Sequence, residues 1–183
     1  MLKNILPKVL TQYQKKITRQ EYTKKPSIEG IKIIELKNFS DEGGFLCEMA
    51  RVDENGFLEG YSDFKIAQIN YSEALPGVVK AWHLHFNQED IWYIAPYQNV
   101  LVGLYDLRKN SSTREVSMRL SLGGGKSQLL YIPRGVAHGY ANLSNQPISI
   151  FYLVNQKFNP ESPDEYRLPW DILGKDFWEI KKS

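Results

Sequence analysis

VVKAWHLHF (78–86), DIWYIAP (90–96) and VLVGLYDLR (100–108) follow one another in this 183-residue chain and indicate its fold. Each segment is short and rich in Val, Ile, Tyr or Trp, as β-strands are. The junctions carry Pro, Asn and Gln and show no helix-capping pattern. This part of the chain is therefore predicted to be all β.

Strand-like segments continue on both sides of this region. Their regular spacing favours an antiparallel jelly-roll barrel or sandwich over an α/β fold. The GGGK turn (123–126) leads into such a segment and not into a helix, which argues against a phosphate-binding loop. The further predicted strands are 31–39, 45–53, 64–72, 111–122, 127–133, 139–144 and 148–157, with a turn at 40–44.

We expect one domain at 27–183, preceded by a helical extension at 1–26. The extension is predicted to form a short amphipathic helix that packs on its own domain or on a dimer partner, in preference to a membrane surface. The chain after 160 is rich in Pro and Trp, which indicates a wrapping segment with a short helical turn. The apolar residues at helical spacing in the extension are Leu2, Leu6, Val9, Leu10, Tyr13 and Ile17.

Composition excludes several classes of function. With 23 basic and 21 acidic residues the net charge is +2, so nothing indicates nucleic-acid binding. The single cysteine, Cys47, excludes an intramolecular disulfide framework and fits a reducing compartment. No apolar stretch approaches the length of a membrane span or of a signal-peptide core. We therefore expect a cytoplasmic protein with no membrane partner.

All three histidines lie at the ends of strand-like segments. His83 and His85 belong to 78–86, and His138 lies in YIPRGVAHGY (131–140). A neutral imidazole in an apolar barrel is a competent general base, and a tyrosine phenol can deliver a proton from the opposite side. His83 and Tyr152 are the candidates, and such a pair could epimerise a carbon beside a carbonyl. The alternative for Tyr152 is a core aromatic residue.

Several motifs follow one another along the chain: DEGGF (41–45), QINYS (68–72), GVVKAWH (77–83), YDLRK (105–109), QLLYIPRGVAHGY (128–140), FYLVNQKFNPESPDE (151–165) and LPWD (168–171). In this order they resemble the motifs of the cupins and in particular those of the dTDP-4-dehydrorhamnose 3,5-epimerase family. The resemblance extends from about residue 31 to residue 178. It implies a cupin jelly-roll barrel, a homodimer, a nucleotide-linked 4-keto-6-deoxy sugar as substrate and no cofactor.

The resemblance also implies roles for individual residues. It makes His83 the base, Tyr152 the opposing acid and Lys80 the counterpart of a substrate-binding arginine. His138 and His85 would line the same pocket. The remaining contacts to sugar or nucleotide would come from Gln68, Asn70, Gln128 and Glu48.

The chain departs from the family pattern at several positions. Gly43 stands where the family has an arginine, and Ile91 stands where it has a pocket lysine. Val102 corresponds to the carboxylate beside the second histidine, and Phe158 to a second tyrosine. The aspartate that orients the family's base is expected to be missing, with Asp176 as a possible substitute. Loss of that carboxylate would weaken the base.

The same histidines also permit a metal-dependent alternative. His83, His85 and Glu89 match H-x-H-x3-E, and His138 lies in P-x-G-x2-H, which resembles the metal motifs of germin-like cupins. Three imidazoles and one carboxylate suit a divalent transition metal such as manganese, iron, nickel or zinc and would permit oxygenase or isomerase chemistry. A third reading is a non-catalytic cupin that binds sugar nucleotides.

Overall fold

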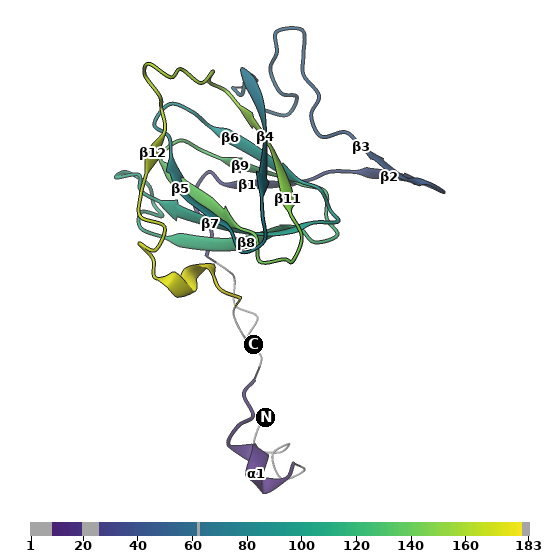
Figure 1. The fold of residues 1–183 in the computed structure, drawn as a ribbon, viewed down its shortest axis with the longest axis vertical. Helices are drawn as coiled ribbons and strands as arrows, with labels where there is room; N and C mark the ends of the chain where they lie inside the picture. Colours follow the sequence, from purple (N-terminus) through teal and green to yellow (C-terminus); the bar gives the residue numbers. More distant parts are fainter. Residues whose placement is uncertain (1–8, 20–25, 62, 181–183) are drawn as a thin grey trace.

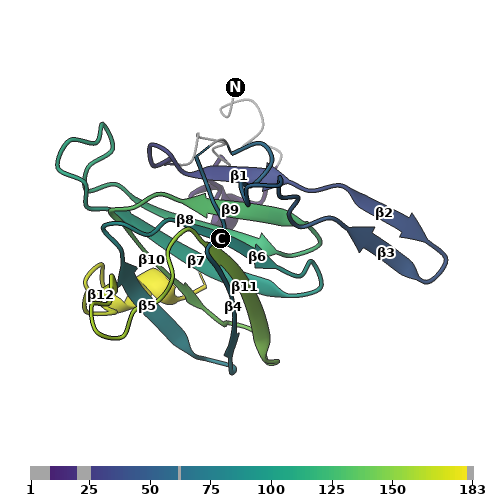
Figure 2. The same cartoon turned by 90° about the horizontal axis from the view of Figure 1, so that it is seen from above.

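A computed structural model describes residues 9–19, 26–61 and 63–180, and it contains two five-stranded antiparallel sheets that face each other (Figures 1 and 2). The first sheet has the order β1 (Lys32–Glu35), β9 (Gln128–Ile132), β6 (Asp90–Ile94), β11 (Ile148–Val154) and β4 (Gln68–Ala74). The second has the order β12 (Tyr166–Arg167), β5 (Val79–Leu84), β10 (Val136–Ala141), β7 (Asn99–Asp106) and β8 (Ser117–Gly123). The predicted jelly roll is confirmed.

Side-chain alternation explains why the two sheets pack face to face. On β11, Ile150 is buried between the sheets, whereas its neighbour Phe151 points outward and is partly exposed. The same period of two brings Val100, Val102 and Leu104 of β7 into the core. Burial of these apolar side chains is the main stabilising contribution of the barrel. The inner surface near β5 and β4 is polar instead.

The first predicted strand, 31–39, is divided in the structure. Its first half is β1, which pairs with β9 in the barrel. Its second half is β2 (Asn38–Asp41), which pairs only with β3 (Gly44–Cys47) in a hairpin that projects from the barrel (Figure 1). The strands predicted at 45–53 and 64–72 are also shifted, because β3 ends at Cys47 and β4 begins at Gln68.

The C-terminal segment wraps around the outside of the second sheet. The expected helical turn corresponds to the 3-10 helix η3 (Lys175–Trp178). Trp178 packs on Trp82 and on Gly103, where an added Cβ would lie 2.5 Å from the indole ring. A side chain at 103 would therefore displace Trp178. This packing anchors the segment that carries β12, which pairs with β5 at the edge of the sheet.

The predicted N-terminal extension contains one described helix, α1 (Thr11–Gln14), and none of its residues is buried. Leu2 and Leu6 lie outside the described residues. Among the helices that the structure describes, none has the length and apolar character needed to cross a membrane.

Candidate active site

A bulge between β5 and β10 brings two functional side chains of β5 to one face. His138 is opposite His83, and Tyr140 is opposite Lys80, so β5 has one residue more than β10 between these pairs. Without the extra residue, positions 80 and 83 would face opposite sides of the sheet. Gly139 allows the close approach, because an added Cβ there would lie 2.5 Å from the Cβ of Ala81.

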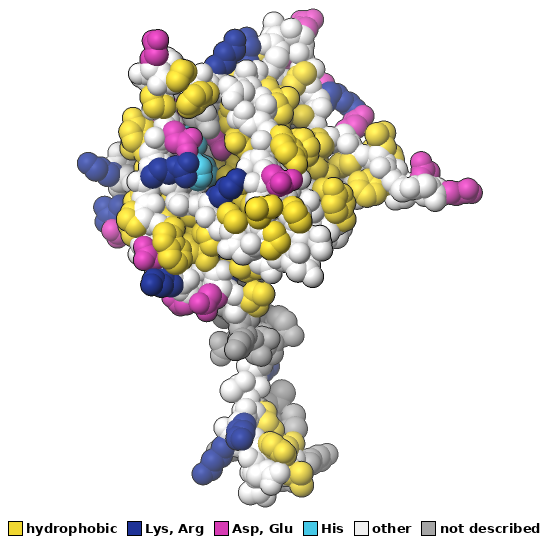
Figure 3. All heavy atoms as spheres, in the orientation of Figure 1, with side chains coloured by type: hydrophobic (Ala, Val, Ile, Leu, Met, Phe, Trp, Pro, Cys, Tyr) yellow, Lys and Arg dark blue, Asp and Glu magenta, His cyan; other side chains and the backbone are white. Residues whose placement is uncertain are grey.

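The histidines line a cavity of about 660 Å³ between the two sheets. In Figure 3 a histidine is visible in a hollow on the surface, bordered by basic and acidic side chains. One wall is the polar face of β4, where Gln68 donates a hydrogen bond from Nε2 to Asn70 Oδ1 at 2.7 Å. On the same strand, Ser72 Oγ lies 3.0 Å from the hydroxyl of Tyr140. The cavity thus combines imidazoles with amides and hydroxyls that suit a sugar.

His83 is held between an acidic and a basic side chain of the C-terminal segment. Its Nδ1 lies 2.9 Å from Glu165 Oε1, and its Nε2 lies 2.9 Å from Arg167 Nη1. Arg167 Nη2 is in turn 2.7 Å from the same Glu165 oxygen. Since a carboxylate accepts and a guanidinium donates, the neutral ring carries its hydrogen on Nδ1 and its lone pair on Nε2.

The environment keeps His83 neutral at pH 7. Burial, together with the nearby imidazole of His138 and the guanidinium of Arg167, lowers the pKa of His83 to about 4. Glu165 acts in the opposite direction and raises the pKa. A neutral imidazole beside a carboxylate can accept a proton, and the carboxylate then stabilises the imidazolium.

The other two imidazoles, those of His138 and His85, have ring centres 5.2 Å apart and are oriented by backbone carbonyls. His138 stacks on His83 with ring centres 6.0 Å apart, and its Nδ1 lies 3.0 Å from the carbonyl oxygen of Val136. His85 Nδ1 lies 2.5 Å from the carbonyl oxygen of Asp164. Burial lowers the pKa of His138, which is therefore also neutral.

Tyr152 reaches the cavity from the opposite sheet. It lies on β11 between Asn70 of β4 and Trp92 of β6 in the strand register. Burial raises the pKa of its phenol, so the hydroxyl keeps its proton at neutral pH. A proton acceptor on one sheet therefore faces a proton donor on the other.

Most of the predicted site residues line this one cavity. They are Gln68, Asn70, Lys80, His83, His85, His138 and Tyr152. Glu48 is instead paired with Arg51 on the surface at 2.6 Å, and Gln128 donates to Glu35 at 2.5 Å. Neither of these two lines the cavity, and their contact with a ligand stays a prediction.

Three of the predicted departures take a different form in the structure. Ile91 packs in a cluster on the far face of β6, so a pocket cation could not arise at that position. The sequence predicts that the carboxylate beside the second histidine is lost at Val102, which is a core residue, but Asp90 supplies one: its Oδ2 lies 3.6 Å from His138 Nε2. Asp176 lines another cavity, and Glu165 is the carboxylate on His83.

Sequence reasoning missed the roles of Asp90, Glu165 and Arg167. Alternation along DIWYI places Asp90 and Trp92 on one face, so Asp90 could have been found by extending the strand pattern from the histidines. Glu165 and Arg167 belong to an irregular tail whose path over β5 has no periodic signal in the sequence. The position of this tail beside β5 is known only from the three-dimensional structure.

The metal-binding arrangement predicted from the motifs is not assembled as expected. Glu89 accepts hydrogen bonds from Arg134 at 3.0 Å and from Asn155 at 3.2 Å, so its carboxylate is engaged elsewhere. A different group, His85, Asp90 and His138, has ligand atoms within 4.8 Å of one another. The carboxylate of Asp90 already accepts from Gln88 and from Trp92, which satisfies it without an ion.

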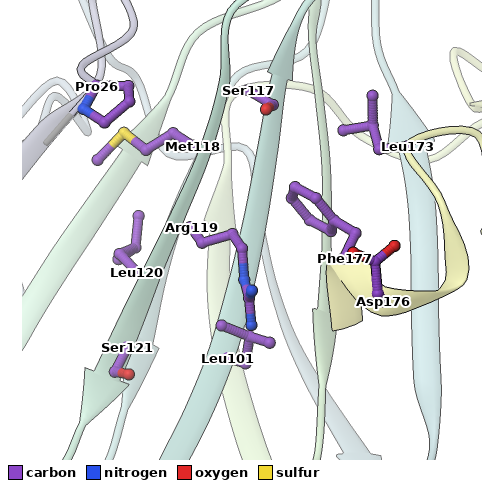
Figure 4. A pocket seen from close by; sticks show the side chains of 10 residues that line it. All are labelled: Pro26, Leu101, Ser117, Met118, Arg119, Leu120, Ser121, Leu173, Asp176 and Phe177. Carbon is purple, nitrogen blue, oxygen red and sulfur yellow. The ribbon is translucent and has the colours of Figure 1, made fainter. Parts of the chain in front are cut away.

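A second cavity, of about 600 Å³, lies on the outer face of β8 under the C-terminal segment (Figure 4). Arg119 projects into it, opposite Asp176 and Phe177. It contains no histidine or tyrosine, and thus lacks a group suited to acid–base chemistry near pH 7. The histidine cavity is therefore the candidate active site.

The fold and site together define the class of protein: a jelly-roll protein with a histidine–tyrosine pocket between its sheets. Residues 25–175 match the family model of dTDP-4-dehydrorhamnose 3,5-epimerase, and the chain belongs to this family. It is thus an isomerase-type enzyme by family, as the sequence motifs predicted.

Individual relatives agree with this assignment. The chain is 42% identical over 144 residues to the spore coat polysaccharide biosynthesis protein SpsL of Bacillus subtilis, covering 79% of this chain and 91% of that protein. It is 28% identical to the probable low-salt glycan biosynthesis epimerase Agl13 of Haloferax volcanii, covering 80% of this chain and 90% of the relative.

Solved structures resemble the fold closely. A dTDP sugar isomerase from Desulfovibrio desulfuricans superposes with a TM-score of 0.68 at 28% identity, covering 80% of this chain and 88% of the other. An epimerase from Legionella pneumophila in complex with dTDP-4-keto-L-rhamnose superposes with a TM-score of 0.67 at 27% identity, covering 79% and 75%.

Proposed function

We propose that this protein epimerises a nucleotide-linked 4-keto-6-deoxy sugar, with His83 as general base and Tyr152 as general acid. The observation that carries the proposal is the convergence of a neutral imidazole and a protonated phenol from opposite sheets on one cavity. Deprotonation of one face of a carbon and reprotonation of the other inverts its configuration.

The first step needs an acidic carbon and a base of defined tautomer. A ketone at C4 acidifies the hydrogens at C3 and C5, because the resulting carbanion is an enolate. His83 Nε2 takes the proton, and Glu165 on Nδ1 stabilises the imidazolium that forms. In the second step the Tyr152 hydroxyl delivers a proton to the opposite face, and the C4 carbonyl re-forms.

The nucleotide part of the substrate rests on the family and on the cations near the pocket. Solved relatives were crystallised with dTDP or a dTDP-linked sugar. In this chain Lys80 lines the cavity, and its Nζ donates to the carbonyl of Glu73 at 2.6 Å and to Ser72 at 3.3 Å. We propose Lys80 as a diphosphate contact, as the family resemblance implies, and no cofactor. Cytoplasmic location remains a prediction.

We also propose that the chain functions as a homodimer. The β2–β3 hairpin exposes Phe39, Phe45 and Leu46, and the outer face of the edge strand β4 exposes Ile69 and Tyr71. Apolar side chains on a projecting hairpin and an open sheet edge invite association with another chain. A two-fold dimer would cover both surfaces.

A metal-dependent cupin is the second candidate, because His85, Asp90 and His138 lie close together and are buried. Both imidazoles have Nδ1 on a backbone carbonyl, the arrangement that commonly orients metal-binding histidines. In that case the imidazoles and the carboxylate would hold a divalent ion. Metal content of the purified protein distinguishes this candidate from the epimerase.

Replacement of Tyr152 by Phe tests the assignment of acid and base. The variant should retain exchange of the C3 or C5 hydrogen with solvent and should lose most of the inversion, because only the return of the proton needs the phenol. Product configuration and solvent exchange can both be followed by NMR on a dTDP-linked 4-keto-6-deoxy sugar. Equal losses of exchange and inversion would remove Tyr152 from the role of acid.

A further inference from the structure

Arg167 makes a hydrogen bond to the nitrogen of His83 that would have to accept the proton of the substrate. Its Nη1 lies 2.9 Å from His83 Nε2, the nitrogen that carries the lone pair when Nδ1 donates to Glu165. A guanidinium only donates hydrogen bonds, so this contact uses the lone pair itself. In this arrangement His83 cannot accept a proton from a substrate.

The position of Arg167 allows it to leave. It belongs to β12, a two-residue strand at the edge of the sheet beside β5, and 56% of its side chain is exposed. Within the described residues, its side chain makes polar contacts with the carboxylate of Glu165 and the imidazole of His83. Both contacts are made by the end of the guanidinium, so rotation of a long side chain is enough to break them.

An anionic ligand would give Arg167 an alternative partner. Arg167 and Lys80 are the cationic side chains among the described residues that line the cavity, whereas the positions expected to supply further cations hold Gly43 and Ile91. A guanidinium binds a phosphate through two parallel charge-assisted hydrogen bonds, and a diphosphate carries more negative charge than the single carboxylate of Glu165, which Arg167 would leave together with the neutral imidazole.

We propose that Arg167 is a cap on His83 that a nucleoside diphosphate removes. In the empty cavity Arg167 covers Nε2, and when a nucleotide sugar binds it moves to the diphosphate and exposes the base. The idea deepens the proposed function and rests on it, because it names the event that makes His83 available.

Release of the cap also strengthens the base. The groups that contact His83 are Glu165 and Arg167 from the C-terminal segment and His138 from β10, and Lys80 of β5 and His85, which follows β5, line the same cavity. Among them, His138 and Arg167 lower the pKa of His83 in addition to burial. Departure of the guanidinium therefore raises this pKa toward the operating pH, where general bases are most effective.

The first test needs no turnover. Diethyl pyrocarbonate acylates a neutral imidazole at a free nitrogen, and peptide mass spectrometry measures the rate at His83. At pH 7 the R167M variant should be modified about tenfold faster than the wild type, as expected from loss of one charge-assisted hydrogen bond. The matched control is R134M, which removes an arginine paired with Glu89 outside the cavity and should match the wild type.

The second test measures affinity for dTDP by calorimetry. R167M should bind dTDP about tenfold more weakly than the wild type, whereas R134M should be unchanged. With a dTDP-linked 4-keto sugar, R167M should raise KM and leave kcat within about threefold, because the cap is absent from the bound state. Equal thermal midpoints would show that both variants fold.

Two results would overturn the proposal. If His83 reacts equally fast in R167M and in the wild type, Arg167 does not cover the base. If the modification accelerates but dTDP affinity does not change, the diphosphate is not what moves Arg167. Failure of the epimerase assignment would appear separately: the modification rates of His83 and the dTDP affinities would be as expected, but no hydrogen of a keto sugar would exchange.

Discussion

Replacement of Glu165 by Gln removes a charge from His83 and preserves the shape of the contact. Glu165 Oε1 lies 2.9 Å from His83 Nδ1, and the amide oxygen of glutamine can accept the same hydrogen bond. The tautomer of His83 is therefore kept. What is lost is the negative charge that stabilises the imidazolium formed when the substrate gives up its proton.

The size of the loss follows from distance and solvent access. Opposite unit charges 2.9 Å apart attract by about 1.4 kcal/mol in water and by several times more in a protein interior. Because 35% of the Glu165 side chain is exposed and its oxygen also pairs with Arg167, the interaction lies near the lower limit. We expect a loss of about 1.4 to 2.7 kcal/mol, or about 10- to 100-fold in the rate of proton abstraction.

The assay is the pH dependence of kcat/KM for solvent exchange at C3 and C5 of a dTDP-linked 4-keto-6-deoxy sugar. Glu165 raises the pKa of His83, which is about 4 in the wild type, so its removal lowers that pKa further. A base is active above its pKa. The plateau should therefore fall while the acid limb of the profile moves to lower pH.

Glu161→Gln is the matched control, because it changes an exposed glutamate of the same segment and should behave as the wild type. A Glu165→Gln enzyme with an unchanged plateau would refute the claim that the charge of Glu165 stabilises the imidazolium of His83. An acid limb that moves to higher pH would refute the electrostatic reasoning.

Three further predictions concern metal, assembly and stability. Protein purified without added metal should carry far less than one equivalent of transition metal by mass spectrometry, because the carboxylate of Asp90 already accepts hydrogen bonds from Gln88 and Trp92. Stoichiometric metal that is lost in His85→Ala would favour the metal-dependent candidate. Sedimentation at micromolar concentration should give a dimer, and a monomer would remove the reason for the exposed apolar hairpin. Asp106→Asn should destabilise the fold by about 3 kcal/mol in denaturant unfolding, because the buried carboxylate accepts from Arg108 at 2.8 Å. Burial raises the pKa of Asp106, but the hydrogen bonds from Arg108, Ser111 and Thr113 outweigh burial and lower this pKa. The stabilisation is therefore present above about pH 4 and is lost as the pH falls further. Identical acid unfolding of the variant and the wild type would contradict this expectation.

The sequence predicted the barrel well because β5 to β11 are short segments rich in apolar and β-branched residues and are separated by turn residues. It predicted the first strand poorly, since 31–39 contains no Gly or Pro to mark the point where the chain leaves the barrel. Composition alone does not indicate that β2 pairs only with β3. That choice depends on which strand edge is available in three dimensions.

The site was predicted in part for a similar reason. The histidines and Tyr152 lie in regular strands, so a barrel brings them together once the strand order is given. Lys80 and His83 are three positions apart, so in a regular strand they would face opposite sides of the sheet. Only the bulge opposite Gly139 places both side chains in the cavity. Glu165 and Arg167 come from an irregular tail, where no periodic pattern indicates which side chain contacts the base.

The proposed reaction begins with proton abstraction by His83 beside a ketone, and incorporation of deuterium from heavy water tests this step most directly. A dTDP-linked 4-keto-6-deoxy sugar incubated with the wild-type protein should take up deuterium at C3 or C5, and His83→Asn should reduce the uptake to the rate in buffer alone. Uptake that is equally fast in His83→Asn would contradict the account, as would a wild-type protein that binds the sugar nucleotide and exchanges nothing.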